Sequence, residues 1–338
     1  MSRGPGEAHH SAPARRRWPG LGGLFGSVRE VSVDRPVRRA AVPATVVDTV
    51  RRRVGEDVEI ATLTEGLDLE AIDFLVPSFE RHLVGELPRL TRLSVVQVLS
   101  AGTDWIQDHL PPQAALCNAR GARDRPVAEW VLGALLGAST GLLEFSGATR
   151  WDRSRPLQDL GSWTVLVVGM GSIGRQLARN LAPLGTRVIG VGSHAHGDLH
   201  GPDELGELLP RADAVVVLAP LSDATRGLIG ADALQRMRDG SLLVNAARGA
   251  VVDTDALTAE LGSGRLRAVL DVVDPEPFPE THPLWQAPGL LCLTPHIAGD
   301  SPAGHARAAE LVADQLARWS RGEHLINVVR PGLNRTGA

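Results

Sequence analysis

The stretch "VVGMGSIGRQLARNLAPLG", residues 167–185, gives the strongest indication of the fold of this chain. It carries a G-x-G-x-x-G pattern between a strand-like run at 163–169 and a helix with apolar periodicity, and a second strand-like run follows at 187–192. In such a βαβ unit the glycines permit a tight turn, close approach of a pyrophosphate and close helix packing, and the helix N-terminus faces the phosphates. The stretch therefore predicts a dinucleotide-binding loop. Its residues are Gly169, Met170, Gly171, Ser172, Ile173 and Gly174.

Short apolar runs that end in turn residues continue on both sides of this loop. Downstream they are "AVVVLAP", "SLLVNAA", "RAVLDVV" and "GLLCLTP", and upstream they begin near Arg38 with "RRAAVP" and "VEIATL". Their alternation with helical runs predicts two α/β units, each with a parallel sheet. A buried helix is expected from about Pro126 through "GLLEF", and an amphipathic helix from Pro302 to about Arg321. Residues 1–36, rich in Gly, Pro and Arg, are expected to form a disordered tail.

Composition excludes several classes of protein. The chain has 338 residues, a formal net charge of -4 and no run of 18 apolar residues, so neither nucleic-acid binding nor a membrane span is expected. Lysine is absent, which excludes Schiff-base enzymes and the phosphate-loop lysine. The two cysteines, Cys117 and Cys292, lie far apart without ligand-like neighbours, so we expect no metal site and a reduced, cytoplasmic protein.

The residues after the strand at 187–192 bear on cofactor choice. An acidic residue at this place usually binds the ribose hydroxyls of NAD, but here Gly192 is followed by Ser193 and His194. Ser193 can donate a hydrogen bond to the extra phosphate of NADP, and His194 can add partial positive charge. The cofactor is therefore expected to be NAD(H) or NADP(H), with NADP(H) slightly favoured.

Three later strands end in polar residues that could act on a substrate. Arg248 follows one strand, Asp271 and Glu276 follow the next, and His296 follows the last. If the strands are parallel, these groups emerge at the edge that binds the dinucleotide. Arg248 can fork onto a substrate carboxylate, His296 can exchange a proton with a carbonyl or hydroxyl, and Glu276 can favour the imidazolium. Singly each has an ordinary surface or loop role; together they predict interconversion of 2-hydroxy and 2-keto acids.

These stretches resemble the D-isomer-specific 2-hydroxyacid dehydrogenase family over residues 38–330. "VVGMGSIG", "LAPLSDATRGLI", "LVNAARGAVVD", "LDVVDPEP" and "LTPHIAG" have the family's order and spacing. The resemblance implies catalytic Arg248, Glu276 and His296, a nicotinamide-facing Asp271, and a substrate loop in "SAGTDW". The further residues that it implies are Ala219, Pro220, Thr225, Ala246, Ala247, His296 and Gly299 for the cofactor, and Ala101, Gly102, Thr103, Arg248 and His296 for the substrate.

The resemblance also implies an architecture. It gives two Rossmann-like or flavodoxin-like domains of α/β class, with the active site in the cleft between them, and homodimers formed through the coenzyme domain. The substrate (catalytic) domain would be discontinuous, with residues 38–125 plus 302–330, and residues 126–301 would form the dinucleotide-binding domain.

The sequence leaves several functions open. A reductase acting on glyoxylate or hydroxypyruvate is favoured, but a phosphite- or phosphonate-oxidising relative would keep the same three catalytic residues. A dinucleotide-sensing protein, similar to the transcriptional corepressors that share this fold, would keep them too. A small 2-keto or 2-hydroxy acid is the expected substrate, and the sequence does not identify which one.

Overall fold

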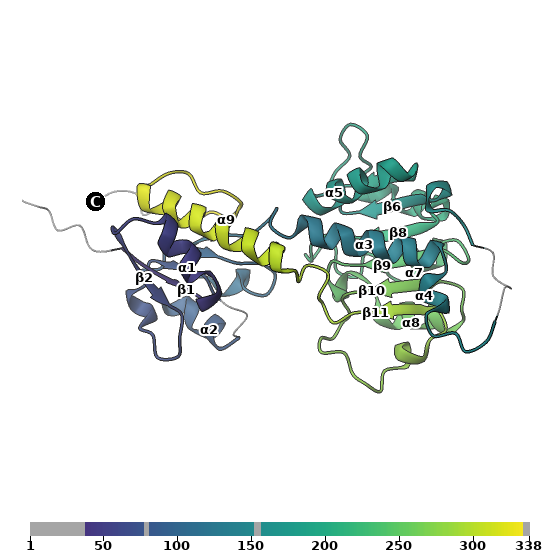
Figure 1. Cartoon of the computed structure of the whole chain (residues 1–338), viewed down its shortest axis with the longest axis horizontal. Helices are drawn as coiled ribbons and strands as arrows, with labels where there is room; N and C mark the ends of the chain where they lie inside the picture. Colours follow the sequence, from purple (N-terminus) through teal and green to yellow (C-terminus); the bar gives the residue numbers. More distant parts are fainter. Residues whose placement is uncertain (1–37, 78–80, 152–156, 334–338) are drawn as a thin grey trace, which may run out of the picture. The chain divides into compact units, whose positions relative to one another are not determined.

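A computed structural model describes residues 38–77, 81–151 and 157–333 (Figure 1). The predicted N-terminal tail lies outside these residues. The described chain forms two six-stranded sheets with helices packed against them. The α-helices are α1 (Ala44–Arg53), α2 (Arg81–Glu86), α3 (Asp124–Ser139), α4 (Leu142–Phe145), α5 (Ser172–Leu181), α6 (Leu205–Leu208), α7 (Ala231–Arg236), α8 (Thr254–Gly262) and α9 (Pro302–Arg321).

The first sheet has the strand order β12-β5-β4-β3-β1-β2. Its strands β1 to β5 pair in parallel, and β12 joins the edge antiparallel to β5. The sequence predicted a parallel unit, so this antiparallel edge strand is a difference; the chain reaches it by a short turn after α9, and mixed edges of this kind are common. The strands are β1 (Arg38–Val42), β2 (Val58–Thr62), β3 (Phe74–Leu75), β4 (Val95–Gln97), β5 (Ala115–Cys117) and β12 (Val328–Arg330).

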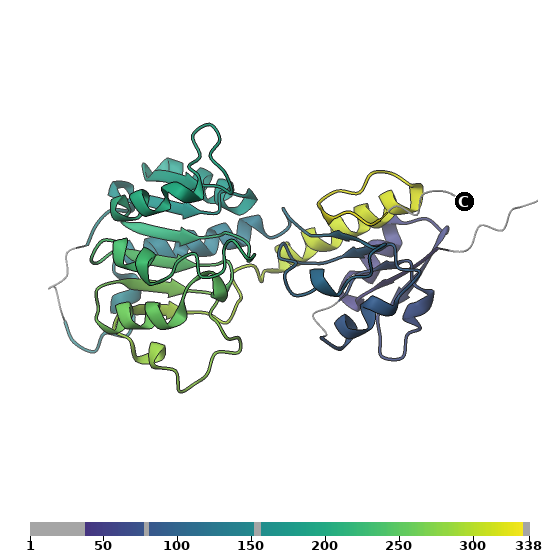
Figure 2. The ribbon, with the colours of Figure 1, turned by 180° about the vertical axis from the view of Figure 1, so that it is seen from behind.

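The C-terminal helix α9 belongs to this first sheet. It lies along α1, as the views from both sides show (Figures 1 and 2), and its Val312, Ala313 and Leu316 are buried in the same apolar cluster as Val46 of α1 and Phe74. The carbonyls of Trp319 and Ser320 accept hydrogen bonds from Arg38 at the start of β1. Val46 and Leu316, which are 270 positions apart in sequence, therefore share one core, although the division of the chain into domains stays a prediction.

The second sheet has the strand order β11-β10-β9-β8-β6-β7, and every neighbouring pair is parallel. The order reverses between β6 and β8, and ligands of such sheets bind outside the carboxyl ends of the strands at this switch point. The strands are β6 (Thr164–Val168), β7 (Arg187–Val191), β8 (Ala214–Val217), β9 (Leu242–Asn245), β10 (Arg267–Leu270) and β11 (Leu290–Leu293).

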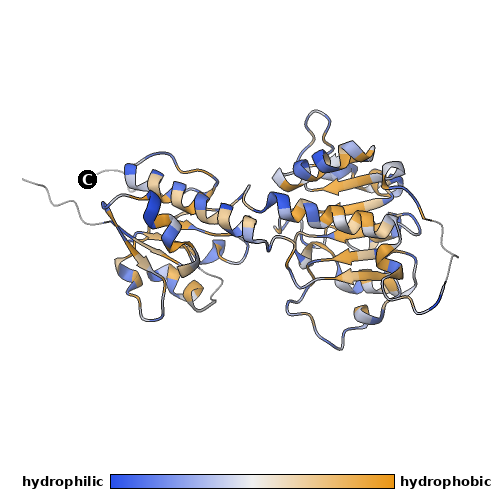
Figure 3. Ribbon diagram, viewed as in Figure 1, coloured by the Kyte–Doolittle hydropathy of each residue, from blue (hydrophilic) through white to orange (hydrophobic). Residues whose placement is uncertain are grey.

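Both faces of the second sheet are buried, which explains its continuous apolar strands (Figure 3). Along β6, Val165 and Val167 pack towards α3 and α5, whereas Leu166 and Val168 pack towards the cluster that includes Leu205 and Leu208 of α6. The helix expected from Pro126 begins at Asp124 and is interrupted at Gly141, whose φ of 75° ends α3 and starts the separate helix α4.

Candidate active site

The glycine-rich loop follows β6 at the switch point. Gly169 has a φ of 106°, and a Cβ there would lie 2.7 Å from the Ala219 Cα, so only glycine fits between the loops after β6 and β8. Gly174 packs equally closely, because its Cβ would lie 2.8 Å from the Gly169 carbonyl oxygen. A Cβ on Gly171 would instead meet no atom within 4 Å. The loop is therefore closely packed at Gly169 and Gly174, whereas the space beside Gly171 is open.

The open side coincides with the start of α5. Gly171 is its N-cap and provides no side-chain acceptor. Within the described residues, the backbone N–H groups of Ser172, Ile173 and Gly174 donate to no acceptor. Free N–H groups at a helix N-terminus next to open space attract phosphate. The loop therefore fits the pyrophosphate of a dinucleotide.

The loops after β7 and β8 flank this position. Ser193 Oγ lies 3.0 Å from His194 Nδ1, and both side chains are exposed. The predicted loop after β8 is held by Thr225, whose hydroxyl donates to the Pro220 carbonyl at 2.6 Å. Arg175 donates to the Met170 carbonyl at 3.0 Å. The first residues after β7 thus present polar hydrogen-bonding groups and no carboxylate.

Arg248 follows β9 and is three-quarters buried. The buried Asn245 shapes this turn, since its side chain accepts from the Ala247 N–H at 3.1 Å and donates to the Arg248 carbonyl at 3.1 Å. A Cβ on Gly249 would overlap the Val273 carbonyl group, so the turn packs directly against the loop after β10. The sequence analysis did not identify Asn245, although a buried polar residue at a strand end is a recognisable signal.

The guanidinium of Arg248 has two anchors. Its Nε donates to both carboxylate oxygens of Asp104, at 3.1 and 3.2 Å, and its Nη1 donates to the Ala247 carbonyl at 2.7 Å. Its Nη2 lies against Gly102, where a Cβ would overlap it. The structure therefore brings Arg248 to the predicted loop at residues 100–105. Asp104 was not predicted to contact it.

The carbonyl groups of this loop are already bonded. Ser100 Oγ donates to the Gly102 carbonyl at 2.6 Å, Asn118 donates to the Ala101 carbonyl at 2.7 Å, and the Thr103 carbonyl accepts from two backbone N–H groups. The N–H groups of Ala101, Gly102 and Thr103 have no acceptor within the described part of the chain. The loop therefore offers free donors beside the guanidinium of Arg248, which is the donor set that binds a carboxylate.

Glu276 and His296 form a pair at the ends of β10 and β11. His296 Nδ1 lies 2.8 Å from Glu276 Oε2, and the other carboxylate oxygen accepts from the Val273 N–H at 3.2 Å. Burial raises the pKa of Glu276, but the hydrogen bond and charge of His296, the Val273 N–H and the charge of Arg248 together lower it below its ordinary value. The pair therefore holds an ionised carboxylate against the imidazole, and His296 Nε2 has no protein partner among the described residues.

Asp271 is buried beneath His296. Its carboxylate accepts from Thr294 Oγ1 at 2.6 Å, from the Ile297 N–H at 2.8 Å and from the Ala298 N–H at 3.0 Å. Its own carbonyl accepts from the His296 N–H at 2.8 Å. Asp271, which is only 3% exposed, therefore stabilises the turn that carries His296 through hydrogen bonds on both sides of the histidine.

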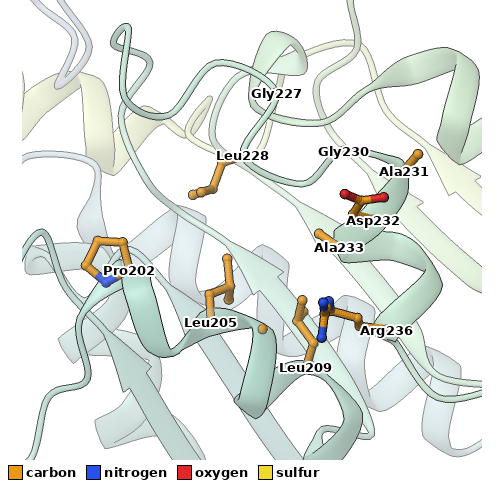
Figure 4. A pocket seen from close by; sticks show the side chains of 11 residues that line it. Pro202, Leu205, Leu209, Gly227, Leu228, Gly230, Ala231, Asp232, Ala233 and Arg236 are labelled. Carbon is orange, nitrogen blue, oxygen red and sulfur yellow. The ribbon is translucent and has the colours of Figure 1, made fainter.

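A separate cavity of about 510 Å³ lies between α6 and α7 (Figure 4). Leu205, Leu209 and Leu228 line it, with Asp232 and Arg236 at the side of α7. None of the described residues that line it was predicted for the site. Among the described residues, no group of three His, Cys, Asp or Glu side chains could hold a metal ion, and no helix is long and apolar enough to span a membrane.

Comparison with known proteins bears on this arrangement. Residues 135–298 match the model of the NAD binding domain of D-isomer specific 2-hydroxyacid dehydrogenases. Erythronate-4-phosphate dehydrogenase of Salinibacter ruber is 35% identical over 292 residues, which cover 80% of this chain and 69% of that protein. Glyoxylate reductase of Thermofilum pendens is 29% identical over 301 residues, 83% of each chain.

A solved structure shares the fold. The D-isomer specific 2-hydroxyacid dehydrogenase of Xanthobacter autotrophicus Py2, crystallised with NADPH and MES, is 28% identical with a TM-score of 0.75. The similarity covers 87% of this chain and 98% of that one.

Proposed function

Because the chain belongs to the D-isomer specific 2-hydroxyacid dehydrogenase family, we propose that Arg248, Glu276 and His296 catalyse the interconversion of a 2-keto acid and a D-2-hydroxy acid. The chain is an NAD(P)-dependent oxidoreductase. The observation that carries the residue assignment is the convergence of Arg248 on a loop with free N–H groups.

The substrate carboxylate binds between these two sets of donors. Arg248 Nη2 and the N–H groups of Gly102 and Thr103 receive its oxygens, and Ala101 completes the loop. Charge-assisted hydrogen bonds of this kind are short and directional, so they also fix the orientation of the neighbouring keto group. Arg248 in addition polarises the carbonyl, because its charge lies next to the reacting carbon once the carboxylate is bound.

His296 moves the proton. In reduction, the protonated imidazole donates the Nε2 proton to the carbonyl oxygen, and in oxidation the neutral imidazole takes it back. Glu276 holds the ring through Nδ1 at 2.8 Å, which leaves Nε2 to face the substrate. Because the pKa of Glu276 is low, its negative charge persists and stabilises the imidazolium before transfer.

The cofactor would bind along the carboxyl ends of the second sheet. Residues 169–174 would hold the pyrophosphate, Gly192, Ser193 and His194 the adenosine ribose, and the loops after β8 and β9 the rest. These last are Ala219, Pro220, Thr225, Ala246 and Ala247, with Asp271, His296 and Gly299 at the nicotinamide end. When bound, the nicotinamide ring supplies or accepts the hydride at the substrate C2.

NADPH is the favoured form of this cofactor. No carboxylate directly follows β7 to repel a 2′-phosphate, and Ser193 can donate to one. The related enzyme from Xanthobacter autotrophicus Py2 was crystallised with NADPH. Glyoxylate and hydroxypyruvate are the first substrates to test, since a glyoxylate reductase is among the relatives.

Arg248→Lys tests the proposal. Lysine keeps the charge but loses the fork, so the KM for the 2-keto acid should rise at least about tenfold. The Kd for NADPH should remain normal, because Arg248 binds the substrate and not the dinucleotide. Initial rates with glyoxylate and hydroxypyruvate, together with fluorescence titration of NADPH, measure both quantities. An unchanged kcat/KM would contradict the assignment.

The assembly and compartment are also proposals. A homodimer is supported by several exposed large apolar side chains on or beside α3 and α4, since apolar side chains left exposed near one element can be covered at an interface. These are Leu136, Leu142, Trp151 and Leu157. A cytoplasmic location is supported by Cys117 and Cys292, which are free. Sedimentation analysis and cell fractionation test the two statements; a monomer would contradict the first and a secreted protein the second.

A further inference from the structure

We propose that Asp104 is a positioning residue, which orients the Arg248 guanidinium towards the substrate carboxylate. The inference rests on the proposed role of Arg248. Asp104 lies on the same loop that provides the free N–H groups, two residues after Gly102, whereas Arg248 follows β9 in the second sheet. This ion pair therefore fixes the position of the Arg248 guanidinium relative to the free N–H groups of the loop, and these are the two sets of donors in the proposed carboxylate site.

The hydrogen bonds of the guanidinium decide which donors remain. Arginine has five N–H groups. Asp104 takes the Nε proton and the Ala247 carbonyl takes one Nη1 proton. Both Nη2 protons and one Nη1 proton are left, and Nη2 is the atom that lies against Gly102. Both terminal nitrogens therefore keep free N–H groups among the described residues, as an end-on bidentate contact with a carboxylate requires.

The burial of both side chains increases the importance of the Arg248–Asp104 ion pair. The Arg248 and Asp104 side chains are 25% and 24% exposed. A guanidinium with so little access to water is destabilised without a counter-charge, and a long side chain without a fixed partner samples several rotamers. Asp104 supplies this counter-charge. The Thr103 carbonyl accepts hydrogen bonds from the Ile106 and Gln107 N–H groups, and this turn fixes the position of the loop.

The same contact could instead hinder catalysis, if Asp104 occupied the place of the substrate. Geometry argues against this, because Asp104 binds Nε and the Nη2 protons keep no acceptor among the described residues. The two roles predict opposite changes. A positioning residue, when removed, raises the KM of the keto acid; a competing anion, when removed, lowers it.

The test uses Asp104→Ala and Asp104→Asn in the full chain, assayed with the 2-keto acid that the parent reduces best. The alanine variant should lose about tenfold or more in kcat/KM, mainly through KM, because a charged hydrogen bond is removed. The asparagine variant retains an oxygen acceptor for Nε and should lose about threefold. The Kd for NADPH should stay unchanged in both. Asp108→Asn, which removes an exposed carboxylate from the same segment, is the matched control and should behave as the parent.

A double-mutant cycle separates this inference from the function that it rests on. In an Arg248→Lys background, Asp104→Ala should change kcat/KM by less than about twofold, because its effect passes through Arg248. A full additive loss in that background, or a lower KM for Asp104→Asn, would overturn the role of Asp104 alone. A normal KM for Arg248→Lys itself would overturn the proposed function.

Discussion

Gly102→Ala should abolish most of the activity while leaving the fold intact. A Cβ at this position would overlap Arg248 Nη2, lie 2.7 Å from Arg248 Cζ and lie 3.0 Å from Asp104 Oδ1. The backbone of Gly102 does not lie in the left-handed region, so it accepts alanine without strain. The added methyl group therefore displaces the Arg248 guanidinium and also crowds the Asp104 carboxylate that anchors it.

The size of the effect follows from the displacement. Non-bonded carbon atoms approach to about 3.5 Å, so the guanidinium carbon must retreat by about 1 Å, and the overlapped nitrogen by more. A misplacement of about 1 Å at a catalytic group can cost about 100-fold in rate. We therefore expect kcat/KM for the 2-keto acid to fall about 100-fold. Stability should change little, because the displaced atoms are the end of a flexible side chain.

Three measurements check this prediction. Initial rates give kcat/KM, fluorescence titration gives the Kd for NADPH, and thermal unfolding gives the stability. Gly85→Ala is the matched control, since a Cβ there meets no atom within 4 Å and the residue is exposed. A kcat/KM within about threefold of the parent would refute the placement of Arg248 against the substrate loop. A large increase in the Kd for NADPH would show that the methyl group also disturbs the cofactor site.

Two further predictions concern the proton and the cofactor. Glu276 holds the His296 ring through Nδ1 at 2.8 Å, so Glu276→Gln, which weakens this charged hydrogen bond, should lower kcat/KM for reduction by about tenfold without changing the Kd for NADPH; an unchanged kcat/KM would remove Glu276 from this role. Because the pKa of Glu276 lies below its ordinary value, its carboxylate should stay ionised as pH falls through the ordinary range of a glutamic acid, and an acid limb of kcat/KM within that range would contradict the shift. Gly192→Asp should shift the kcat/KM ratio towards NADH by about tenfold, through repulsion of the 2′-phosphate, whereas Gly192→Asn, which adds the same Cβ 3.3 Å from the His194 carbonyl oxygen, should not. A parent that already prefers NADH about tenfold would contradict the interpretation of this loop.

Local patterns predicted the second sheet well. The run "WTVLVVG" became β6 and "RVIGVG" became β7, because both faces of the sheet are buried and the strands are continuously apolar. The amphipathic helix after Pro302 ends at Arg321 as expected, where Gly322 adopts a φ of 70°. The helix expected through "GLLEF" is not continuous, since Gly141 takes a left-handed conformation that residue preferences alone do not require, and the helix resumes as α4 over Leu142–Phe145.

Contacts between distant segments could not be predicted in this way. Arg248 and Asp104 are 144 positions apart, and no periodicity or spacing links them. The residue type still gave a partial signal, because a cation at the end of a buried strand needs a counter-charge. Which carboxylate supplies it depends on how the loop after β4 is folded, and hydrogen bonds from Ser100 and Asn118 decide that fold.

The turn at His296 shows most directly how the fold serves the site. His296 has a φ of 58°, a conformation that L-residues other than glycine seldom adopt and that costs on the order of 1 kcal/mol. The hydrogen bonds to the buried Asp271 carboxylate offset this cost and hold the turn closed. A carboxylate has about four acceptor sites, so at most about one remains for a ligand. Asp271 therefore acts first on the histidine, by fixing the direction in which the imidazole leaves the sheet.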